Sequence, residues 1–295
     1  MVYRMIFNQT AYFGRGAIKE IPAVAKQHGF TKAFIVTDPV LLETGTAEKV
    51  TKVLDEAGLP YEVFSNVKPN PPVECIKDGV AKFAESGADF LIGLGGGSPQ
   101  DTCKGIGIIT ANPEFADVLS LEGVADTKNP SVPIFGVPTT AGTASETTIN
   151  YVVTDTANKR KFVAVDPHDI PIVAFVDPDL TDSMPRGLKV ATGLDALTHA
   201  IEGYITPGAW SLSDCLSMQT IRMIAKNLAK SATRHSGRRA DGLRVLHHRY
   251  GLLQRGPRSG ARHGSPAGRP SGRGPRCGQR YSAGPGHGIQ QGLHR

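Results

Sequence analysis

Short apolar runs alternate with amphipathic stretches through residues 3–180 of this chain. The apolar runs predict strands within 3–13, 33–36, 61–67, 90–94, 133–137 and 172–176, and two more around a turn within 151–165. Apolar positions three or four residues apart predict helices over 17–28, 41–57, 73–86 and 98–110. Strands that alternate with such helices predict a parallel sheet in a doubly wound α/β domain, whose ligands bind beyond the carboxyl ends of the strands.

A glycine turn joins the strand at 90–94 to the helix that follows it. Gly95, Gly96 and Gly97 allow the backbone to approach a phosphate closely, and the N–H groups at the helix start point toward the anion. Ser98 is a suitable N-cap residue, with Asp101 three positions further on as in a capping box. A tight turn with ordinary caps is the alternative interpretation.

Polar side chains also follow three other strands. Asp38 follows the strand at 33–36, where a carboxylate can accept hydrogen bonds from ribose hydroxyls and repel a 2′-phosphate, which favours NAD over NADP. A helix cap is the alternative role for this residue. Asn70 follows the next strand among prolines and is either a site residue or a plain turn residue. Residues 138–146 follow the strand at 133–137 and are rich in hydroxyls and small side chains, which suits close contact with a cofactor.

The pattern after Pro185 becomes helical and carries two residue types that bind metals. Asp195 and His199 are four positions apart, so they share one face of this helix. An Asp and a His at that spacing on an otherwise apolar helix can supply two ligands to a divalent metal. A buried, hydrogen-bonded Asp–His pair without a metal is the alternative.

Cysteine usage and hydropathy predict a cytoplasmic location. The four cysteines are scattered without a CxxC pair, which indicates free thiols in a reducing compartment. The first residues lack the apolar core of a signal peptide, and no apolar run reaches membrane-spanning length. We therefore expect no membrane association.

Three motifs taken together resemble the iron-containing (group III) alcohol dehydrogenases. They are the glycine turn with Asp101, the Pro-Thr-Thr-Ala-Gly-Thr stretch at 138–143 with Glu146, and the Gly-Leu-Asp-Ala-Leu-Thr-His-Ala-Ile-Glu stretch at 193–202. The stretches 112–118 and 162–171 resemble the subgroup that interconverts lactaldehyde and 1,2-propanediol. The resemblance covers about residues 1–232.

The resemblance implies a fold like that of dehydroquinate synthase. Residues 1–183 would form an α/β NAD-binding domain with a parallel sheet, and residues 184–232 would begin an all-α metal-binding domain. The resemblance also implies NAD and Fe²⁺ as cofactors, with Zn²⁺ as the alternative metal. It implies a cytoplasmic homodimer that acts on a small alcohol or aldehyde, with lactaldehyde and 1,2-propanediol as the expected pair. The metal would polarise the alcohol oxygen, and hydride would move between the substrate carbon and the nicotinamide.

Individual residues take roles through the same resemblance, and none is assigned as a catalytic acid or base. The pyrophosphate would be held by Gly96, Gly97 and Ser98, and the adenosine ribose by Asp38. The nicotinamide side would be lined by Thr139, Thr140, Thr143, Asn150 and Lys161. Two further cofactor contacts are expected at Asn70 and Asp101, and the metal ligands are Asp195 and His199. Without the resemblance, Lys161 is also interpretable as a solvated surface lysine.

The composition changes abruptly after about residue 232. Residues 234–295 hold thirteen arginines, no lysine and one acidic residue, so they carry +12 in a chain whose net charge is +6. They also hold fourteen glycines and five prolines. No family motif is legible there, although the family completes its metal site with two histidines further along the chain. We expect residues 233–295 to be disordered, apolar surface on 186–230 to stay exposed, and the chain as written to have little or no activity.

A change of reading frame near codons 232–240 would explain this composition. Residues 261–268, back-translated with degenerate codons and read one nucleotide later, allow His-Gly-Met-Ala-His-Gln-Leu-Gly, which resembles the family's third-ligand segment. Residues 275–279 allow His-Gly-Val-Ala-Asn, which resembles the fourth-ligand segment. The missing ligands would then fall at the codons now read as Ala261 and Pro275.

Two other interpretations remain open. An arginine- and glycine-rich segment can be a nucleic-acid-binding arm, which would make this chain a truncated, non-catalytic NAD-binding protein. Its only aromatic residues are Tyr250 and Tyr281, so base stacking would be sparse and a nucleic-acid partner is not expected. Dehydroquinate synthases and glycerol-phosphate dehydrogenases use NAD and a metal on the same architecture. The Asp195/His199 spacing favours the alcohol dehydrogenase branch.

Overall fold

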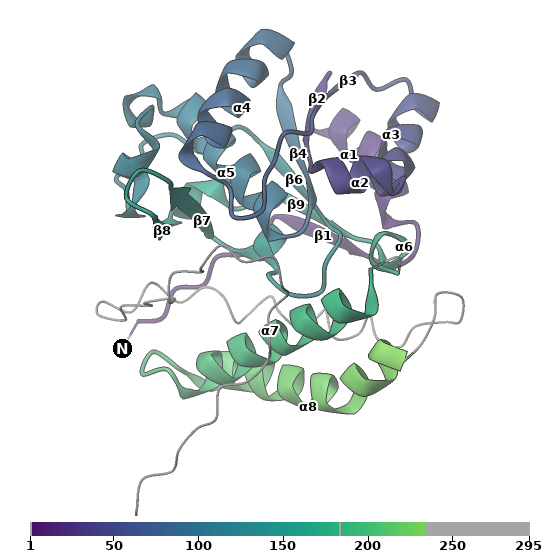
Figure 1. Ribbon diagram of the computed structural model, residues 1–295, viewed down its shortest axis with the longest axis vertical. Coiled ribbons are helices and arrows are strands. Elements are labelled where there is room, and N and C mark those ends of the chain that lie inside the picture. Colours follow the sequence, from purple (N-terminus) through teal and green to yellow (C-terminus); the bar gives the residue numbers. More distant parts are fainter. Residues whose placement is uncertain (1, 183, 234–295) are drawn as a thin grey trace, which may run out of the picture. The chain divides into compact units, whose positions relative to one another are not determined.

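A computed structural model of the chain describes residues 2–182 and 184–233. The predictions for residues 234–295, including the missing metal ligands at Ala261 and Pro275, lie outside the described residues. Six strands form one sheet in the order β1-β9-β6-β4-β2-β3, and every pairing in it is parallel (Figure 1). These strands are β1 (Thr10–Phe13), β2 (Ala33–Val36), β3 (Tyr61–Phe64), β4 (Phe90–Gly95), β6 (Ile134–Pro138) and β9 (Val173–Val176). The predicted parallel α/β architecture is confirmed.

Helices cover both faces of this sheet (Figure 1), because successive residues of a strand point to opposite faces. Ile35 of β2 packs into a core with α1 (Ile21–Gln27) and α3 (Thr46–Glu56). Its neighbour Phe34 packs into a second core with α4 (Val73–Ser86) and α5 (Gly97–Ala111). Burial on both faces explains why these strands are uninterrupted apolar runs in the sequence.

Two predicted helices are divided, and two predicted strands are shorter than expected. Residues 17–28 form a 3₁₀ helix, η1 (Ala17–Glu20), followed by α1. Gly45, with φ of 69°, separates α2 (Pro39–Glu43) from α3, because a positive φ breaks the helical path and glycine adopts it without a Cβ clash. The strand predicted within 3–13 is paired only over β1, and the strand predicted at 61–67 is paired only over β3. Helix α4 has the predicted bounds.

A second sheet of three strands, in the order β5-β8-β7, shares an apolar core with α4 and α5. Its strands are β5 (Gly123–Val124), β7 (Asn150–Asp155) and β8 (Arg160–Val165). β7 and β8 pair antiparallel, as predicted for the hairpin within 151–165. The remaining short elements are η2 (Pro113–Phe115), η3 (Val118–Leu121), η4 (Ser145–Thr147), η5 (Pro167–Asp169) and α6 (Pro178–Thr181).

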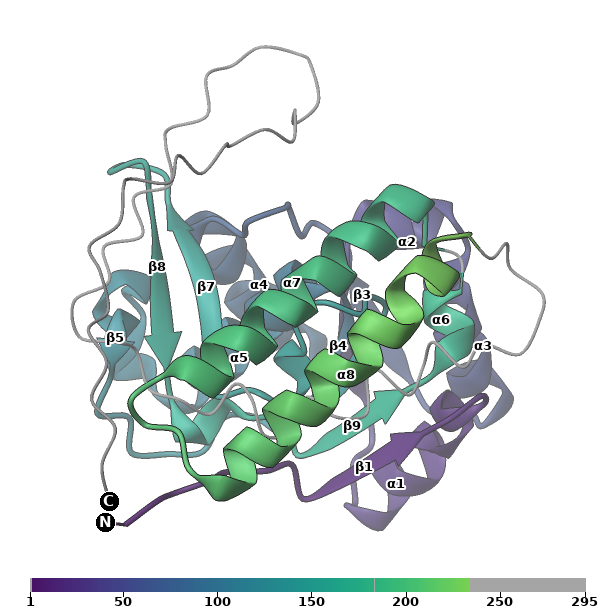
Figure 2. The same ribbon diagram turned by 90° about the horizontal axis from the view of Figure 1, so that it is seen from below.

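Two long helices follow, α7 (Arg186–Ile205) and α8 (Ser211–Thr233), and they lie side by side (Figure 2). The prediction of helices after the α/β sheet is therefore confirmed. Several of their large apolar side chains are more than 40 % exposed, as expected from the sequence. They are Leu188, Leu194, Ile201, Tyr204, Ile205 and Leu212. None of the helices in the described ranges combines the length and apolarity needed to cross a bilayer.

Candidate functional site

The glycine turn lies at the carboxyl end of β4, inside the six-stranded sheet. Gly95 ends β4 with φ of 153°, a backbone conformation that favours glycine. Gly96 is the N-cap residue of α5, which begins at Gly97, and this cap makes no side-chain hydrogen bond. The first N–H groups of a helix have no partner within the helix, so the turn can present them to an anion such as phosphate.

The capping box predicted for Ser98 and Asp101 is wrong. The chain enters the helix at Gly96, so Ser98 lies inside the first turn rather than at the cap. Its Oγ accepts a hydrogen bond from the backbone N–H of Asn70 at 3.2 Å. The hydroxyl therefore ties the turn to the loop after β3.

The loop after β6 (residues 139–144, the threonine loop) carries the predicted threonines and packs directly on the glycine turn. The backbone N–H of Thr139 donates to the carbonyl of the last residue of β4 at 3.0 Å. A Cβ atom at Gly96 would lie 3.0 Å from Cγ2 of Thr140, and one at Gly97 would lie 2.9 Å from Cγ2 of Thr143. A side chain at Gly97 would therefore require Thr143 to shift, and one at Gly96 would press on Thr140, so the turn packs closely against the loop.

Asn70 connects the loop after β3 to two other segments. Its backbone has φ of 55°, a left-handed conformation that Asn tolerates better than most residues. Its carbonyl oxygen accepts from Thr154 Oγ1 at 2.9 Å, and its Oδ1 accepts from Lys161 Nζ at 2.7 Å. The structure thus brings Asn70, Ser98 and Lys161 together, with both Asn70 and Lys161 exposed to solvent.

Asp38 lies at the carboxyl end of β2, which borders β4 on the side opposite β6. Its Oδ1 accepts a hydrogen bond from the backbone N–H of Leu41 at 3.0 Å, so it caps α2. The cap uses Oδ1, and the side chain is half-buried. A cap and a hydrogen bond to a ribose hydroxyl are compatible at a carboxylate, because each oxygen has two lone pairs.

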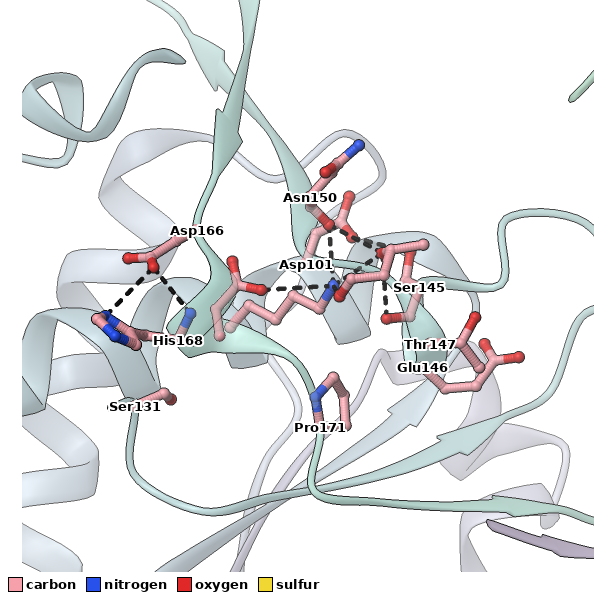
Figure 3. Close-up of polar contacts among 12 residues, drawn as sticks. Asp101, Ser131, Ser145, Glu146, Thr147, Asn150, Asp166, His168 and Pro171 are labelled. Carbon is pink, nitrogen blue, oxygen red and sulfur yellow. Dashed lines mark hydrogen bonds and ion pairs between the residues drawn. The ribbon is translucent and has the colours of Figure 1, made fainter. Parts of the chain in front are cut away.

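Asp101 extends from α5 toward the segment that follows the threonine loop (Figure 3). Its Oδ1 accepts from Ser145 Oγ at 3.0 Å, and its Oδ2 accepts from the backbone N–H of Val152 at 3.1 Å. Burial raises the pKa of Asp101 to about 6, although Lys104 and the two hydrogen bonds act in the opposite direction. Both carboxylate oxygens bond within the protein, so Asp101 joins two parts of the site, and its contact with a cofactor stays a prediction.

The two predicted metal ligands are neighbours on α7. Asp195 Oδ1 and His199 Nε2 are 3.4 Å apart, and the side chains are 44 % and 33 % exposed. This exposure disagrees with the alternative of a buried structural pair. A Cβ atom at Gly142 would lie 3.1 Å from Asp195 Oδ2, so the pair adjoins the threonine loop.

Asp195 and His199 carry donor atoms of the kinds that metals bind, and their role as metal ligands stays a prediction. Carboxylate oxygen and imidazole nitrogen suit Fe²⁺ or Zn²⁺, and such ions take about four or more ligands. Within residues 2–182 and 184–233, no group of three or more His, Cys, Asp or Glu side chains could hold a metal. Asp195 and His199 therefore fit half of a site.

Lys104 is a buried charge that the sequence analysis did not single out. Its side chain is 0 % exposed, and Nζ donates to the carbonyl and Oγ1 of Thr148 and to the carbonyl of Asn150. Asp169 Oδ1 lies 3.9 Å away and is equally buried. Burial lowers the pKa of Lys104 and raises that of Asp169. The sequence does hold an indication of this role. Asp101 and Lys104 are the only charged residues of α5, and their spacing of three positions puts these opposite charges on one face of the helix.

Comparisons with known proteins agree with the resemblance read from the motifs. The model of the family "Iron-containing alcohol dehydrogenase" matches residues 8–178, and that of "Fe-containing alcohol dehydrogenase family, C-terminal" matches residues 189–242. The second match extends to residue 242, about ten positions beyond the end of the resemblance near residue 232.

Relatives of known activity cover the same part of the chain. Lactaldehyde reductase of Escherichia coli K12 is 58 % identical over 231 residues, which are 78 % of this chain and 60 % of that protein. A crystal structure of 1,3-propanediol oxidoreductase matches with a TM-score of 0.78 and 37 % identity, over 85 % of this chain and 64 % of that one. Sulfoacetaldehyde reductase from Bifidobacterium kashiwanohense in complex with NAD⁺ matches with a TM-score of 0.74 and 27 % identity, over 85 % of this chain and 65 % of that one. The chain thus spans about 60 % of the length of the curated relatives it matches first.

Proposed function

The chain belongs to the iron-containing alcohol dehydrogenase family, and on this premise we propose that it carries the NAD site and half of the metal site of an alcohol–aldehyde oxidoreductase. The proposed substrate pair is 1,2-propanediol and lactaldehyde, in line with the similarity to lactaldehyde reductase. One observation carries the proposal: the threonine loop touches the glycine turn at Gly97 and the metal pair at Asp195. A dinucleotide on the turn and a metal on α7 would be separated by this loop alone, which suits a reaction that needs both close to one substrate carbon.

The strand order suggests which way the dinucleotide lies. With the pyrophosphate on the turn after β4, one nucleoside would lie over β2 and the other over β6. The β2 side offers the carboxylate of Asp38, which suits an adenosine ribose. The β6 side leads through Gly142 to Asp195, where the reaction would take place. The nicotinamide half would therefore lie on the β6 side, next to Thr139, Thr140, Thr143 and Asn150.

The protein's own side chains bind and orient in this scheme. The helix start at Gly97 and the hydroxyl of Ser98 would hold the pyrophosphate. Lys161, which the resemblance assigns to the nicotinamide side, is proposed to lie near the pyrophosphate instead, because it bonds Asn70, which bonds Ser98. Asp195 and His199 would hold Fe²⁺, with Zn²⁺ as the alternative. When bound with a full ligand set, such a metal supplies Lewis-acid polarisation of the alcohol oxygen.

The chain as written is proposed to bind NAD and to have little or no dehydrogenase activity. Asp195 and His199 supply two ligands, and the family's other two would fall at the codons read here as Ala261 and Pro275, outside the described residues. We also propose a boundary near residue 183 between the NAD-binding and metal-binding domains, a homodimeric assembly and a cytoplasmic location. Light scattering on the purified protein tests the dimer.

The NAD site and the reaction are tested separately. NADH fluorescence titration of the 295-residue chain should saturate, and NADPH should bind more weakly because Asp38 repels its 2′-phosphate. NAD-dependent oxidation of 1,2-propanediol should appear in a frame-restored chain and be lost in its H199A variant. Failure of NADH to bind the 295-residue chain would refute the proposed cofactor site. Equal activity of both chains would refute the proposed dependence on the missing ligands.

A further inference from the structure

A buried lysine joins the helix of the glycine turn to the segment that leads away from the threonine loop. Lys104 lies two turns into α5, and its ammonium group has three N–H donors. The acceptors are the carbonyl oxygen of Thr148, the Oγ1 of Thr148 at 2.9 Å and the carbonyl oxygen of Asn150 at 2.9 Å. All three donors are thus used within residues 148–150.

The neighbouring charge on the helix adds two more bonds to the same segment. Asp101 accepts from Ser145 Oγ (Figure 3). It also accepts from the backbone N–H of Val152, so its two bonds lie on either side of the lysine's acceptors. Helix α5 is therefore hydrogen-bonded to four residues of the segment 145–152, namely Ser145, Thr148, Asn150 and Val152. The glycine turn at one end of α5 and the residues around Asn150 are held as one body.

Packing alone does not account for a charge at position 104. A buried ammonium loses its hydration, and an apolar side chain of similar size packs at lower cost. The nearby carboxylate of Asp169 does not hydrogen-bond to the ammonium group. Its Oδ1 lies 3.9 Å from Lys104 Nζ, and neither of its carboxylate oxygens has a hydrogen-bond partner among the described residues. What the lysine adds over an apolar residue is directional contact with two backbone carbonyls, which defines the path of residues 148–150.

We propose that Lys104 is a positioning residue for the nicotinamide half of NAD, acting by holding Thr148 and Asn150 against the helix of the glycine turn. This inference rests on the proposed NAD site, in which Asn150 and the threonine loop lie on the β6 side. The adenosine half would lie over β2, and among the described residues Lys104 bonds only Thr148 and Asn150 and faces Asp169, all away from that side. Loss of the lysine's contacts should therefore weaken one half of the cofactor and spare the other.

Two ligands distinguish binding of the nicotinamide half from binding of the adenosine half. NADH carries both halves, whereas ADP-ribose lacks the nicotinamide. The sharper variant is T148V, which keeps the side-chain shape and both carbonyl acceptors of Lys104. It removes the Oγ1 acceptor of Lys104 together with the longer bonds of that hydroxyl to the carbonyls of Ser145 and Asn150. The matched control is T147V, because Thr147 is also buried and, within the part of the chain that the structure describes, its Oγ1 bonds only the carbonyl of Ala144. K104M removes all three hydrogen bonds of the lysine. Circular dichroism and a thermal melt show whether this variant folds.

We expect T148V to weaken NADH binding roughly threefold to tenfold and K104M to weaken it more, with ADP-ribose affinity within about twofold of wild type in each. T147V should bind both ligands like wild type. If T148V and folded K104M bind NADH as wild type does, or lose both ligands in parallel, the positioning role is refuted. If K104M does not fold, the NADH and ADP-ribose affinities of T148V and T147V decide whether the positioning role holds. Wild type that binds neither ligand would refute the NAD site itself, which is a different result.

Discussion

Lys161 Nζ donates a 2.7 Å hydrogen bond to Asn70 Oδ1, joining β8 to the loop after β3 across 91 positions of sequence. Asn70 in turn donates its backbone N–H to Ser98 in the first turn of α5. The lysine, although exposed, is thus directed toward the phosphate side of the proposed cofactor site rather than into open solvent.

The substitution K161M should weaken NADH binding with little change in stability. Loss of one cation near a pyrophosphate is expected to raise the Kd roughly threefold to tenfold, and more at low ionic strength. The melting temperature should hardly move, because exposed polar contacts contribute about 0–1 kcal/mol. Fluorescence titration at two salt concentrations measures this. K128M, at an exposed lysine elsewhere, is the control, and equal affinities of the two variants would contradict the prediction.

The substitution G97A should disrupt the glycine turn by steric contact. The new Cβ would lie 2.9 Å from Thr143 Cγ2, so the threonine loop would have to move away from the turn. NADH binding should fall at least about tenfold, with about 1–3 kcal/mol lost from the free energy of unfolding. The double variant G97A/T143S removes the obstructing methyl group and should recover part of both losses. G187A, where a Cβ would meet nothing within 4 Å, is the control.

The substitution D101N should change how stability depends on pH. Burial raises the pKa of Asp101 from 3.8 to about 6, so the folded protein holds this proton more tightly than the unfolded chain does. The stability that results is fully present below pH 3.8 and is lost as pH rises through about 6. Over that window D101N should gain stability relative to wild type by roughly 3 kcal/mol at most, since one pKa unit is about 1.4 kcal/mol.

Urea unfolding of wild type and D101N between pH 4 and pH 7 measures this difference. The comparison is meaningful because an asparagine can still offer Oδ1 to the Val152 N–H and donate Nδ2–H to the Ser145 hydroxyl. D126N, at an exposed aspartate, should run parallel to wild type. Parallel curves for D101N as well would show that Asp101 pays no such ionisation cost in the fold.

Metal binding by the chain as written should be weak and should depend on α7. Co²⁺ is a suitable probe, because its visible absorption reports the coordination geometry. We expect partial occupancy that EDTA removes without lowering the melting temperature, since two ligands contribute little folding free energy. H199A should abolish the remaining signal, whereas a frame-restored chain should bind Co²⁺ tightly and melt earlier after chelation. Tight binding by the 295-residue chain would mean that ligands exist outside the described residues.

Sequencing of the source DNA across codons 225–295 tests the proposed change of reading frame. A shift by one base near codons 232–240 should open the reading His-Gly-Met-Ala-His and remove the arginine-rich composition. The C-terminal family model matches residues 189–242, so the resemblance to the family extends into the region of the proposed shift. An unchanged DNA sequence would refute a sequencing error, and the chain would then keep two of the four metal ligands.

The sequence by itself determined the features that depend on neighbouring residues. The alternation of apolar runs and amphipathic stretches predicted the parallel sheet, and the bounds of α4 followed from its apolar spacing. The glycine turn and the Asp195/His199 pair were legible because a tight turn and one helix face are local properties of the chain. Together with the threonine stretch, they were also enough to identify the family.

Only the tertiary structure decided which of these segments meet. It placed β4 between β2 and β6, so that Asp38 and the threonine loop lie on opposite sides of the glycine turn. It moved the cap of α5 to Gly96, because close packing of the turn against Thr140 and Thr143 leaves no room for a larger residue there. It also paired Lys104 with Thr148, 44 positions away. Such contacts depend on strand order and burial, which no local pattern of side chains encodes.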